Sequence, residues 1–288
     1  MSAASDVRTF LLDHLRDEAR TFWGERNTAY LERVADDWLD ATGRSGSQYR
    51  IDRIRSLAGS CSTLLDLGAG CGTFVRYALR LGFDAWGVEP QQWKRSVAEH
   101  VLRCDGAPQQ VVRGVGEQLP FDDDRFDCVT TFQTLEHVQN LEKCCAEMVR
   151  VTRPGGGIYI RCPDYALSTY EGHYRLPWLP GMWGERAERY LRWCGRPLTG
   201  FRSLQPVSAR LLRDLFTSIG KKSGIVLTCC NVDYFRIRDK LHLPEHPLVR
   251  GLSGPLFIAH YLRLLLRAEY PVHLYVRIGK KLPSQNSH

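Results

Sequence analysis

The sequence predicts an α/β protein with a parallel, doubly wound sheet and helices on both faces. An apolar run, Leu64 to Leu67, leads into a glycine-rich turn and then into a helical pattern, which is the order of a buried strand, a tight turn and a helix. Strand-like and helix-like segments then alternate along the chain, as in parallel sheets with crossover helices. The expected strands are 63–67, 84–88, 109–113, 126–132 and 156–162, and the expected helices between them are 73–81, 92–103 and 139–152.

The turn after the first predicted strand combines an acid with closely spaced glycines. Asp66 stands two residues before Gly68, and two further glycines follow. Glycine has no Cβ, so this turn lets the backbone approach a ligand closely, and a strand, glycine turn and helix in this order is typical of nucleotide binding. The G-x-G-x-G spacing differs from the G-x-G-x-x-G of dinucleotide-binding proteins. The candidate cofactor-binding residues are Asp66, Gly68, Ala69, Gly70 and Gly72.

The second predicted strand ends in Glu89, and Pro90 follows it. In nucleotide-binding sheets an acid at this position accepts hydrogen bonds from a ribose diol, because its two oxygens accommodate two hydroxyl donors. The alternative is a solvated surface glutamate. We predict that Glu89 binds ribose and that Pro90 lies beside the cofactor.

Residues 114–138 contain three further motifs in a fixed order. Leu119-Pro120-Phe121 precedes an acidic turn, Phe126 to Val129 opens a strand, and Leu135-Glu136-His137-Val138 follows that strand. Together with the glycine turn, these motifs resemble the class I S-adenosylmethionine (SAM) methyltransferases, in the small-molecule type represented by the ubiquinone-pathway O-methyltransferases. The resemblance covers residues 45–165 and, more loosely, the whole chain.

The resemblance implies a Rossmann-like fold with seven strands, mostly parallel, and SAM as cofactor, with S-adenosylhomocysteine as its product. In this fold a helix at 207–219, a strand at 223–229 and a last, antiparallel strand at 272–278 would complete the sheet. Residues 1–59 form an N-terminal helical cap, which either covers the cofactor pocket or only stabilises the fold. Residues 60–288 form the SAM-binding domain.

The resemblance also implies residues around the adenine and the methyl group. Family members often carry Asp-Ala where this chain has Val115-Gly116, and that Asp contacts the adenine amino group. Because valine cannot do so, we expect Glu117 or the backbone at Gly116 to read the base. Gln133 and Thr134 stand where the fourth strand opens on the methyl-transfer centre, and we expect them to contact SAM or the acceptor.

Two insertions interrupt this plan. The first, 164–204, leaves the carboxyl end of the fifth strand, where open α/β sheets bind ligands. It is rich in aromatic and cationic side chains, which suit ring or sugar faces and phosphate or carboxylate groups. We predict that it builds the acceptor pocket, with a helical lid around an ordinary core as the alternative. The acceptor-binding candidates are Tyr170, Tyr174, Arg175 and Trp178.

The second insertion, 231–270, ends in a helical pattern at 253–267 that combines a wide apolar face with a basic stripe. Such a face fits peripheral contact with a membrane interface. It fits a buried helix or a homodimer contact equally well. The sequence leaves these three interpretations open.

The resemblance implies an in-line displacement in which the protein aligns the acceptor with the methyl group. A hydroxyl acceptor also gains from a base that removes its proton. His137, just after the fourth strand, is the leading candidate, with Glu136 as its neighbour, because imidazole titrates in a suitable pH range. His173 and Tyr174 are alternatives, and a Glu-His pair that only orients the next helix is another.

The motifs predict a SAM-dependent O-methyltransferase acting on a small-molecule, sugar or lipid-linked acceptor. The stretch from His173 to Pro180 loosely resembles insertions in methyltransferases of bacterial surface-polysaccharide assembly. A quinone or natural-product phenol is the second acceptor class. Alternatives from other classes are an NAD-dependent oxidoreductase and a non-catalytic SAM-binding protein. Nucleic acid is not expected as a partner, because Thr131-Phe132-Gln133-Thr134 lacks the Asn/Asp, two prolines and aromatic residue of exocyclic-amine methyltransferases.

The composition indicates where the protein is found, but it does not identify the reaction. The 288-residue chain has a formal net charge of +7 and 43% hydrophobic residues, which is ordinary for a soluble globular protein. No apolar run reaches the ~20 residues of a membrane span, and the N-terminus lacks the pattern of a secretory signal. The ten cysteines form no C-x-x-C motif, so we expect no metal site. We also expect the protein to lie in the reducing cytoplasm. Residues 253–267 could additionally hold it at the surface of a membrane.

Overall fold

The computed structural model describes residues 3–44, 46–107, 109–232 and 271–281. Most of the expected second insertion, including the helix at 253–267, lies outside these residues. The N-terminal part is helical: α1 (Ala3–Glu18) continues into a π-helical turn, η1 (Ala19–Trp23), and α2 (Thr28–Leu39) and α3 (Ser47–Ala58) follow. The turn η1 ends at Gly24, whose φ of 68° is left-handed and suits a residue without a Cβ.

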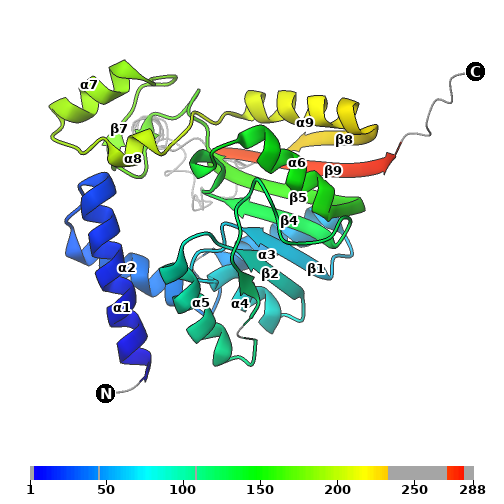
Figure 1. Cartoon of the computed structure of the whole chain (residues 1–288), viewed down its shortest axis with the longest axis horizontal. Helices are drawn as coiled ribbons and strands as arrows, with labels where there is room; N and C mark the ends of the chain where they lie inside the picture. The colour runs from blue at the N-terminus through cyan, green and yellow to red at the C-terminus, as the bar shows by residue number, and fades with distance from the viewer. Residues whose placement is uncertain (1–2, 45, 108, 233–270, 282–288) are drawn as a thin grey trace, which may run out of the picture.

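A seven-stranded sheet forms the centre of the molecule, in the order β3-β2-β1-β4-β5-β9-β8 (Figure 1). The strand β9 runs antiparallel to both of its neighbours, and the other pairs are parallel. The predicted seven-stranded, mostly parallel sheet with an antiparallel last strand is therefore confirmed. The strands are β1 (Thr63–Leu67), β2 (Asp84–Val88), β3 (Val111–Val112), β4 (Phe126–Phe132), β5 (Thr152–Pro163), β8 (Ile225–Asn231) and β9 (Pro271–Lys281).

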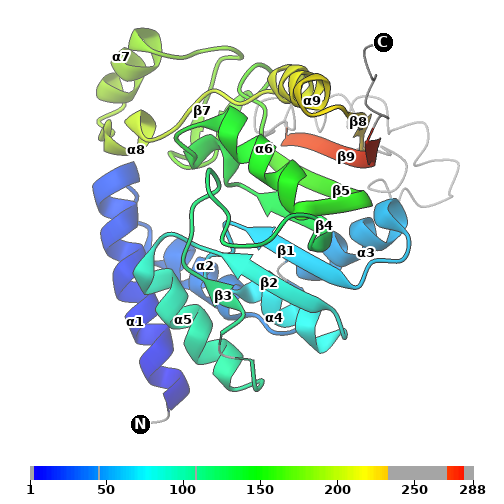
Figure 2. The same ribbon diagram turned by 45° about the vertical axis from the view of Figure 1, so that its right-hand side comes forward.

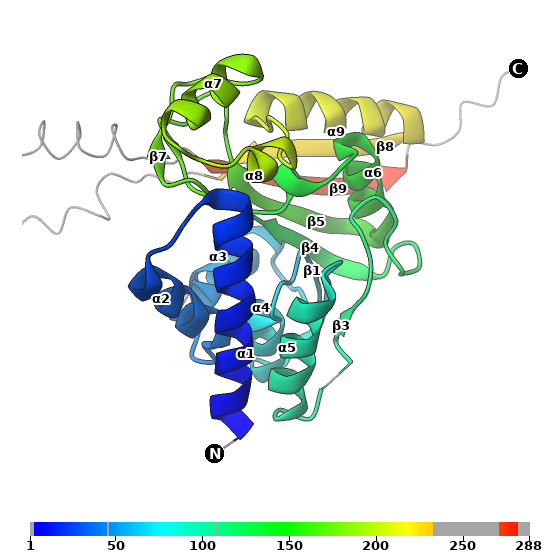
Figure 3. The same ribbon diagram turned by 60° about the vertical axis from the view of Figure 1, so that its left-hand side comes forward.

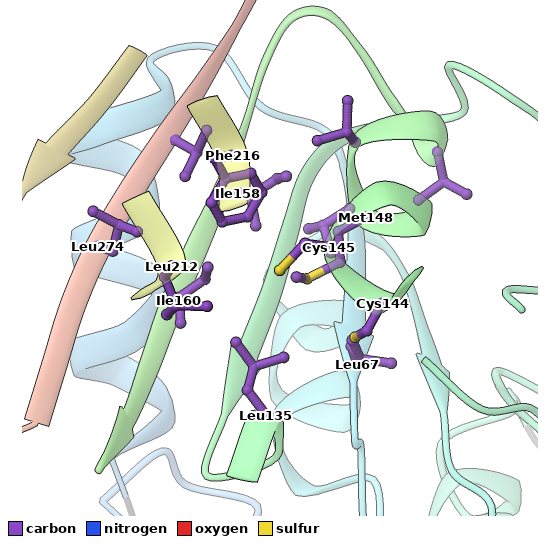
Figure 4. Packing of buried hydrophobic residues seen from close by; sticks show 14 of the residues in the cluster. Leu67, Leu135, Cys144, Cys145, Met148, Ile158, Ile160, Leu212, Phe216 and Leu274 are labelled. Carbon is purple, nitrogen blue, oxygen red and sulfur yellow. The ribbon is translucent and has the colours of Figure 1, made fainter. Parts of the chain in front are cut away.

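Helices cover both faces of this sheet (Figure 2). On one face lie α3, α4 (Thr73–Arg80) and α5 (Gln92–Arg103), and on the other lie α6 (Leu141–Val151) and α9 (Ala209–Ser223). Successive strand residues point to opposite faces, so neighbouring positions of one strand enter two different apolar clusters. Leu64 packs in one cluster and Leu65 in the other. Figure 4 shows the second cluster, where α6 and α9 pack on β5.

The strand order decides where a ligand fits. The chain leaves β1 toward β2 and β3 on one side, and returns to β4 on the other side of β1. Crossover connections that diverge in this way leave a crevice at the carboxyl ends of the two central strands. The glycine turn follows β1, and Gln133 and Thr134 follow β4, so the motifs predicted to bind SAM lie at this edge.

The first insertion adds a small layer above that edge. It contains a hairpin, β6 (Tyr170–Glu171) and β7 (Leu176–Pro177), and the helices α7 (Glu185–Trp193) and α8 (Thr199–Arg202). Its α8 packs on η1, at the end of α1 (Figure 3), so closely that a Cβ on Gly200 would overlap the Trp23 ring. The insertion and the N-terminal helices are therefore in direct contact. Within the described residues, no helix has both the length and the apolar character of a membrane span.

Candidate functional site

A cavity of about 1500 Å³ opens at the carboxyl edge of the sheet. This volume exceeds the ~300–1,000 Å³ of most small-molecule sites, so it can hold two ligands side by side. Its wall joins the glycine turn, the end of β4, the N-terminal helices and the first insertion. The N-terminal helices contribute Phe22, Trp23, Glu25, Tyr30, Trp38 and Arg50, and the insertion contributes Gly172, His173 and Ser203.

Arg50 is fixed in this wall by an ion pair with Asp66 at the end of β1. The guanidinium donates to both carboxylate oxygens, and its Nε donates to Thr130 Oγ1 at 2.7 Å. The ring centroids of Phe74 and Phe132 lie 3.8 and 4.1 Å from its Cζ, so the cation contacts two aromatic rings. Burial raises the pKa of Asp66, and the positive charge of Arg50 opposes that rise. The result is a buried pair of opposite charges beside the glycine turn.

The glycine turn and Glu89 form one hydrogen-bonded unit. Gly68 and Gly70 have φ values of 78° and 54°, which only glycine adopts at low cost. A Cβ at Gly68 would also overlap the Thr134 side chain. The N–H groups of Gly70 and Gln91 each donate to one Glu89 carboxylate oxygen at 2.9 Å. Each oxygen keeps a further lone pair, so this carboxylate can still accept hydrogen bonds from a diol.

Two imidazoles meet in the part of the wall that the insertion reaches. His137 ends a 3₁₀ turn, η2 (Leu135–His137), after β4, and His173 lies between β6 and β7. Their Nε2 atoms are 3.2 Å apart, and the His173 ring stacks on Trp23 with 4.6 Å between centroids. The side chain of His137 is open to the cavity, and the surrounding protein lowers its pKa by desolvation, with His173 and Lys94 contributing in the same direction. His137 is therefore neutral at physiological pH.

Among the described residues, the same two histidines and Glu136 form a group whose side chains are close enough together to bind a metal ion. One ligand atom from each of Glu136, His137 and His173 lies within 4.8 Å of the others. The 3.2 Å between the two Nε2 atoms fits an N–H···N hydrogen bond. Glu136 is fully buried and is not part of the cavity wall, whereas a catalytic ion needs a coordination position open to substrate. The two imidazoles therefore form a hydrogen-bonded histidine pair.

Comparisons with known proteins decide between the nucleotide-binding folds that share this sheet. The family model described as a methyltransferase domain matches residues 65–160, and this range contains the glycine turn, Glu89 and His137. An uncharacterised methyltransferase of Mycolicibacterium paratuberculosis is 33% identical over 183 residues, which cover 63% of this chain and 65% of that protein. The chain contains a class I SAM-dependent methyltransferase domain.

Other methyltransferases show shorter similarity. The ubiquinone biosynthesis O-methyltransferase of Rhizobium rhizogenes is 28% identical over 41% of this chain and 49% of that enzyme. The norajmaline N-methyltransferase of Rauvolfia serpentina is 36% identical over 34% of each chain. These matches, like the mycobacterial one, span less than two thirds of the relatives' length. They agree on methyl transfer and differ in the atom methylated.

A solved structure supports the fold. Phosphoethanolamine N-methyltransferase 2 of Haemonchus contortus, in complex with S-adenosyl-L-methionine, aligns with a TM-score of 0.51 and 16% identity over 93% of this chain and 60% of that one. At this identity the likeness shows the fold alone.

The methyltransferase cavity fits the chemistry of its cofactor. The zwitterionic end of SAM carries an amino group and a carboxylate, and the Asp66–Arg50 pair offers the opposite charges. The space beside Gly70 is open, since a Cβ there would meet no atom within 4 Å. Gln133 faces the cavity with a left-handed φ of 53°, an unusual conformation for a residue other than glycine and one that often marks functional sites. Ala69, Pro90 and Thr134 also line the methyltransferase cavity, as expected of cofactor contacts.

Three predicted cofactor contacts lie elsewhere. Gly72 caps the start of α4. Gly116 packs against α6, where a Cβ would lie 2.7 Å from Cys144 Sγ. Glu117 accepts hydrogen bonds from the N–H groups of Gln139 and Asn140 at 2.6 and 3.0 Å, so its carboxylate orders the loop before α6. None of the three belongs to the cavity wall, which corrects the placement of Gly116 and Glu117 at the adenine and of Gly72 among the glycines that contact the cofactor.

The four predicted acceptor contacts also need correction. Tyr174 and Trp178 are 1% and 3% exposed and form the core of the insertion with Phe201. The Tyr174 hydroxyl donates to Pro197 O and accepts from Phe201 N, which leaves it no role as a base. Burial raises its pKa to about 12. Aromatic content identified the insertion, but its rings pack against one another.

Arg175 and Tyr170 lie near the cavity without lining it. Arg175 pairs with Glu25 at 2.9 Å and its Cζ lies 4.2 Å from the Tyr30 ring centroid. Arg175 therefore joins the insertion to the N-terminal helices, and Glu25 and Tyr30 present their other sides to the cavity. Among the insertion residues predicted from the sequence to bind the acceptor or act as a base, His173 lines the cavity.

Proposed function

We propose that the protein transfers a methyl group from SAM to a hydroxyl oxygen of a small-molecule, sugar or lipid-linked acceptor. One observation carries this proposal. A single cavity contains the residues suited to hold SAM (Asp66, Gly70 and Glu89) together with an imidazole, His137, that is neutral at physiological pH. A base serves a hydroxyl acceptor, which must lose a proton as its oxygen is methylated.

The residues divide the work according to their chemistry. SAM, when bound, supplies an electrophilic methyl group. Glu89 holds the ribose diol, Asp66 the α-amino group and Arg50 the α-carboxylate. Trp23 and His173 line the cavity beside His137, where they can hold the acceptor near the base. His137 accepts the hydroxyl proton.

A phenolic acceptor, such as a quinone precursor, is the second candidate. The rings of Phe22, Trp23 and Tyr30 line the acceptor side of the cavity and favour stacking on an aromatic ring. The similarity to a ubiquinone biosynthesis O-methyltransferase supports the same class.

We propose a cytoplasmic site of action, since all ten cysteines are free in the structure, as is usual for a reducing compartment. Homodimer formation and membrane contact through 253–267 remain proposals.

Methyl-labelled SAM tests the proposal directly. Purified protein is incubated with labelled SAM and a lysate of the source organism, and products are separated into organic and aqueous phases and identified by mass spectrometry. Label on an oxygen in the organic phase would indicate a lipid-linked or quinone-type acceptor, and label on an oxygen in the aqueous phase a soluble sugar or metabolite. Label on nitrogen alone would overturn the hydroxyl assignment.

Calorimetry distinguishes the other classes of protein. Binding of S-adenosylhomocysteine without binding of NAD is expected. Preference for NAD would indicate an oxidoreductase. Tight binding of S-adenosylhomocysteine with no labelled product from any lysate would indicate a non-catalytic SAM-binding protein.

A further inference from the structure

Glu171 lies behind the histidine pair, and its carboxylate is held on three sides. It is 1% exposed. Its Oε1 accepts from Tyr165 Oη at 3.2 Å and contacts His173 Nδ1 at 2.7 Å, and its Oε2 accepts from the N–H of Tyr174 at 2.6 Å. The hairpin of β6 and β7 thus fixes an acidic group directly against an imidazole that faces the cavity.

This contact determines the proton positions on both imidazoles. An ionised carboxylate only accepts hydrogen bonds, so His173 donates from Nδ1, and neutral His173 then carries a lone pair on Nε2. The 3.2 Å contact between the Nε2 atoms requires His137 to donate from Nε2. Neutral His137 therefore keeps its lone pair on Nδ1, where it can accept a proton from an acceptor.

We infer that Glu171, His173 and His137 form a proton relay for the acceptor hydroxyl, with Glu171 as the positioning residue that fixes the histidine tautomers. The inference rests on the proposed O-methyl transfer. The hydroxyl proton passes to His137 Nδ1 while the acceptor oxygen bonds to the methyl carbon and sulfur keeps the electron pair of the broken bond. The Nε2 proton of His137 passes to His173 Nε2. The positive charge then lies on His173, beside Glu171.

The relay explains how a histidine in this environment can act as a base. Desolvation disfavours a charge on His137 itself, and the cationic Lys94 of α5 adds to this effect. Moving the charge to His173 places it 2.7 Å from a carboxylate and against the face of Trp23, which attracts cations. Within the described residues, the ionisable groups close to the pair include Glu171 from β6, Lys94 from α5 and Glu136, which precedes His137.

Side-chain ¹H–¹⁵N NMR of the histidines in the full-length protein tests the relay without an acceptor. We expect Nδ1–H on His173 and Nε2–H on His137 at neutral pH. In Glu171→Gln, the pH at which the pair takes up a proton should fall by about one unit or more, because an opposite charge has been removed. Glu147→Gln is the matched control: Glu147 also accepts from a backbone N–H, that of Leu119, but its carboxylate pairs with Arg150 rather than with an imidazole. The control should leave the histidine signals unchanged.

Three results would overturn the relay. One is Nδ1–H on His137, and another is a Glu171→Gln protein that folds and titrates like the wild type. The third is a stoichiometric metal in the purified protein, or histidine signals that shift on adding Zn²⁺ and return with EDTA, since these indicate a metal centre. If Glu171→Gln does not fold, His173→Gln replaces it, and loss of the Nε2–H preference of His137 is expected. Binding of S-adenosylhomocysteine, measured separately, reports on the proposed function whatever the tautomers.

Discussion

The two halves of the cavity are built in different ways. The cofactor half comes mainly from one continuous stretch, from β1 through the glycine turn to Glu89 at the end of β2. Arg50 joins it from the preceding helix, and Gln133 and Thr134 join it from the end of β4. The acceptor half combines the N-terminal helices with the first insertion, segments more than a hundred residues apart in the sequence. Contacts such as Arg175–Glu25 and Arg196–Gly24 hold these segments together. Local sequence therefore encodes the first half, and tertiary packing assembles the second.

The two halves also differ in how firmly their polar groups are fixed. Asp66, Arg50 and Glu89 are all buried and bonded to the sheet or its turns. Arg175 and Glu25 lie in a partly exposed ion pair, of a kind worth little free energy. The cofactor half should therefore tolerate substitution poorly, and the acceptor half should vary with smaller effects on stability.

The largest effect should come from His137→Ala, which removes the base but no cofactor contact. Turnover of labelled SAM should fall on the order of 10²-fold or more, while affinity for S-adenosylhomocysteine stays the same. His100→Ala, on α5 and outside the cavity wall, is the matched control. Unchanged turnover in His137→Ala would remove this residue from the mechanism.

Arg50→Ala should mainly affect stability, because it leaves the Asp66 carboxylate buried without its cation. Removing one partner of a buried ion pair costs about 3–5 kcal/mol, measured as the free energy of unfolding in urea. A double variant, Arg50→Met with Asp66→Asn, should recover much of that stability but not the affinity for S-adenosylhomocysteine. Full binding by the double variant would show that the ion pair is structural only.

Glu89→Ala should weaken binding of S-adenosylhomocysteine roughly 10- to 100-fold, since hydrogen bonds to a charged group contribute about 1.5–3 kcal/mol. Calorimetry measures this change. The Glu89→Gln variant keeps the side-chain shape and one acceptor oxygen, so an intermediate affinity is expected. Retained affinity in both variants would refute the ribose assignment.

A pH-dependent effect on stability concerns His273 of β9, which pairs in register with Arg161 of β5. Burial lowers its pKa to about 3, and Arg161 and Arg53 add to this. Between that value and the ordinary pKa near 6.5, the unfolded chain binds a proton that the folded protein does not. The free energy of unfolding should therefore fall as pH drops through this window, by at most about 1.4 kcal/mol per pH unit. His273→Gln should reduce the slope, and an identical slope would contradict the assignment.

The strands that carry the cofactor half could be predicted because their sequence signals are local. The acid, the glycines and the strand-ending glutamate occupy fixed positions on consecutive elements, and β1, β2 and β4 have the bounds that the pattern indicated. Arg50 carried no such signal, since an arginine on an amphipathic helix is ordinary until the fold places it on Asp66.

The acceptor half shows why composition misleads. Tyr174 and Trp178 were expected to bind the acceptor because the insertion is aromatic, yet an isolated insertion needs its own core, and these rings supply it. Trp23 and Tyr30, from the N-terminal helices, line the cavity instead. Glu117 was expected at the adenine, but the loop before α6 uses its carboxylate. In each case a tertiary contact, invisible to sequence spacing, decided the role.

A crystal structure with S-adenosylhomocysteine bound would test the two-part cavity most directly. We expect the ribose to lie on Glu89 and the amino acid end at Asp66 and Arg50. We expect the sulfur atom to face the His137–His173 pair across the acceptor half. A sulfur atom directed away from the two histidines, or a ligand that occupies the acceptor half itself, would contradict this expectation.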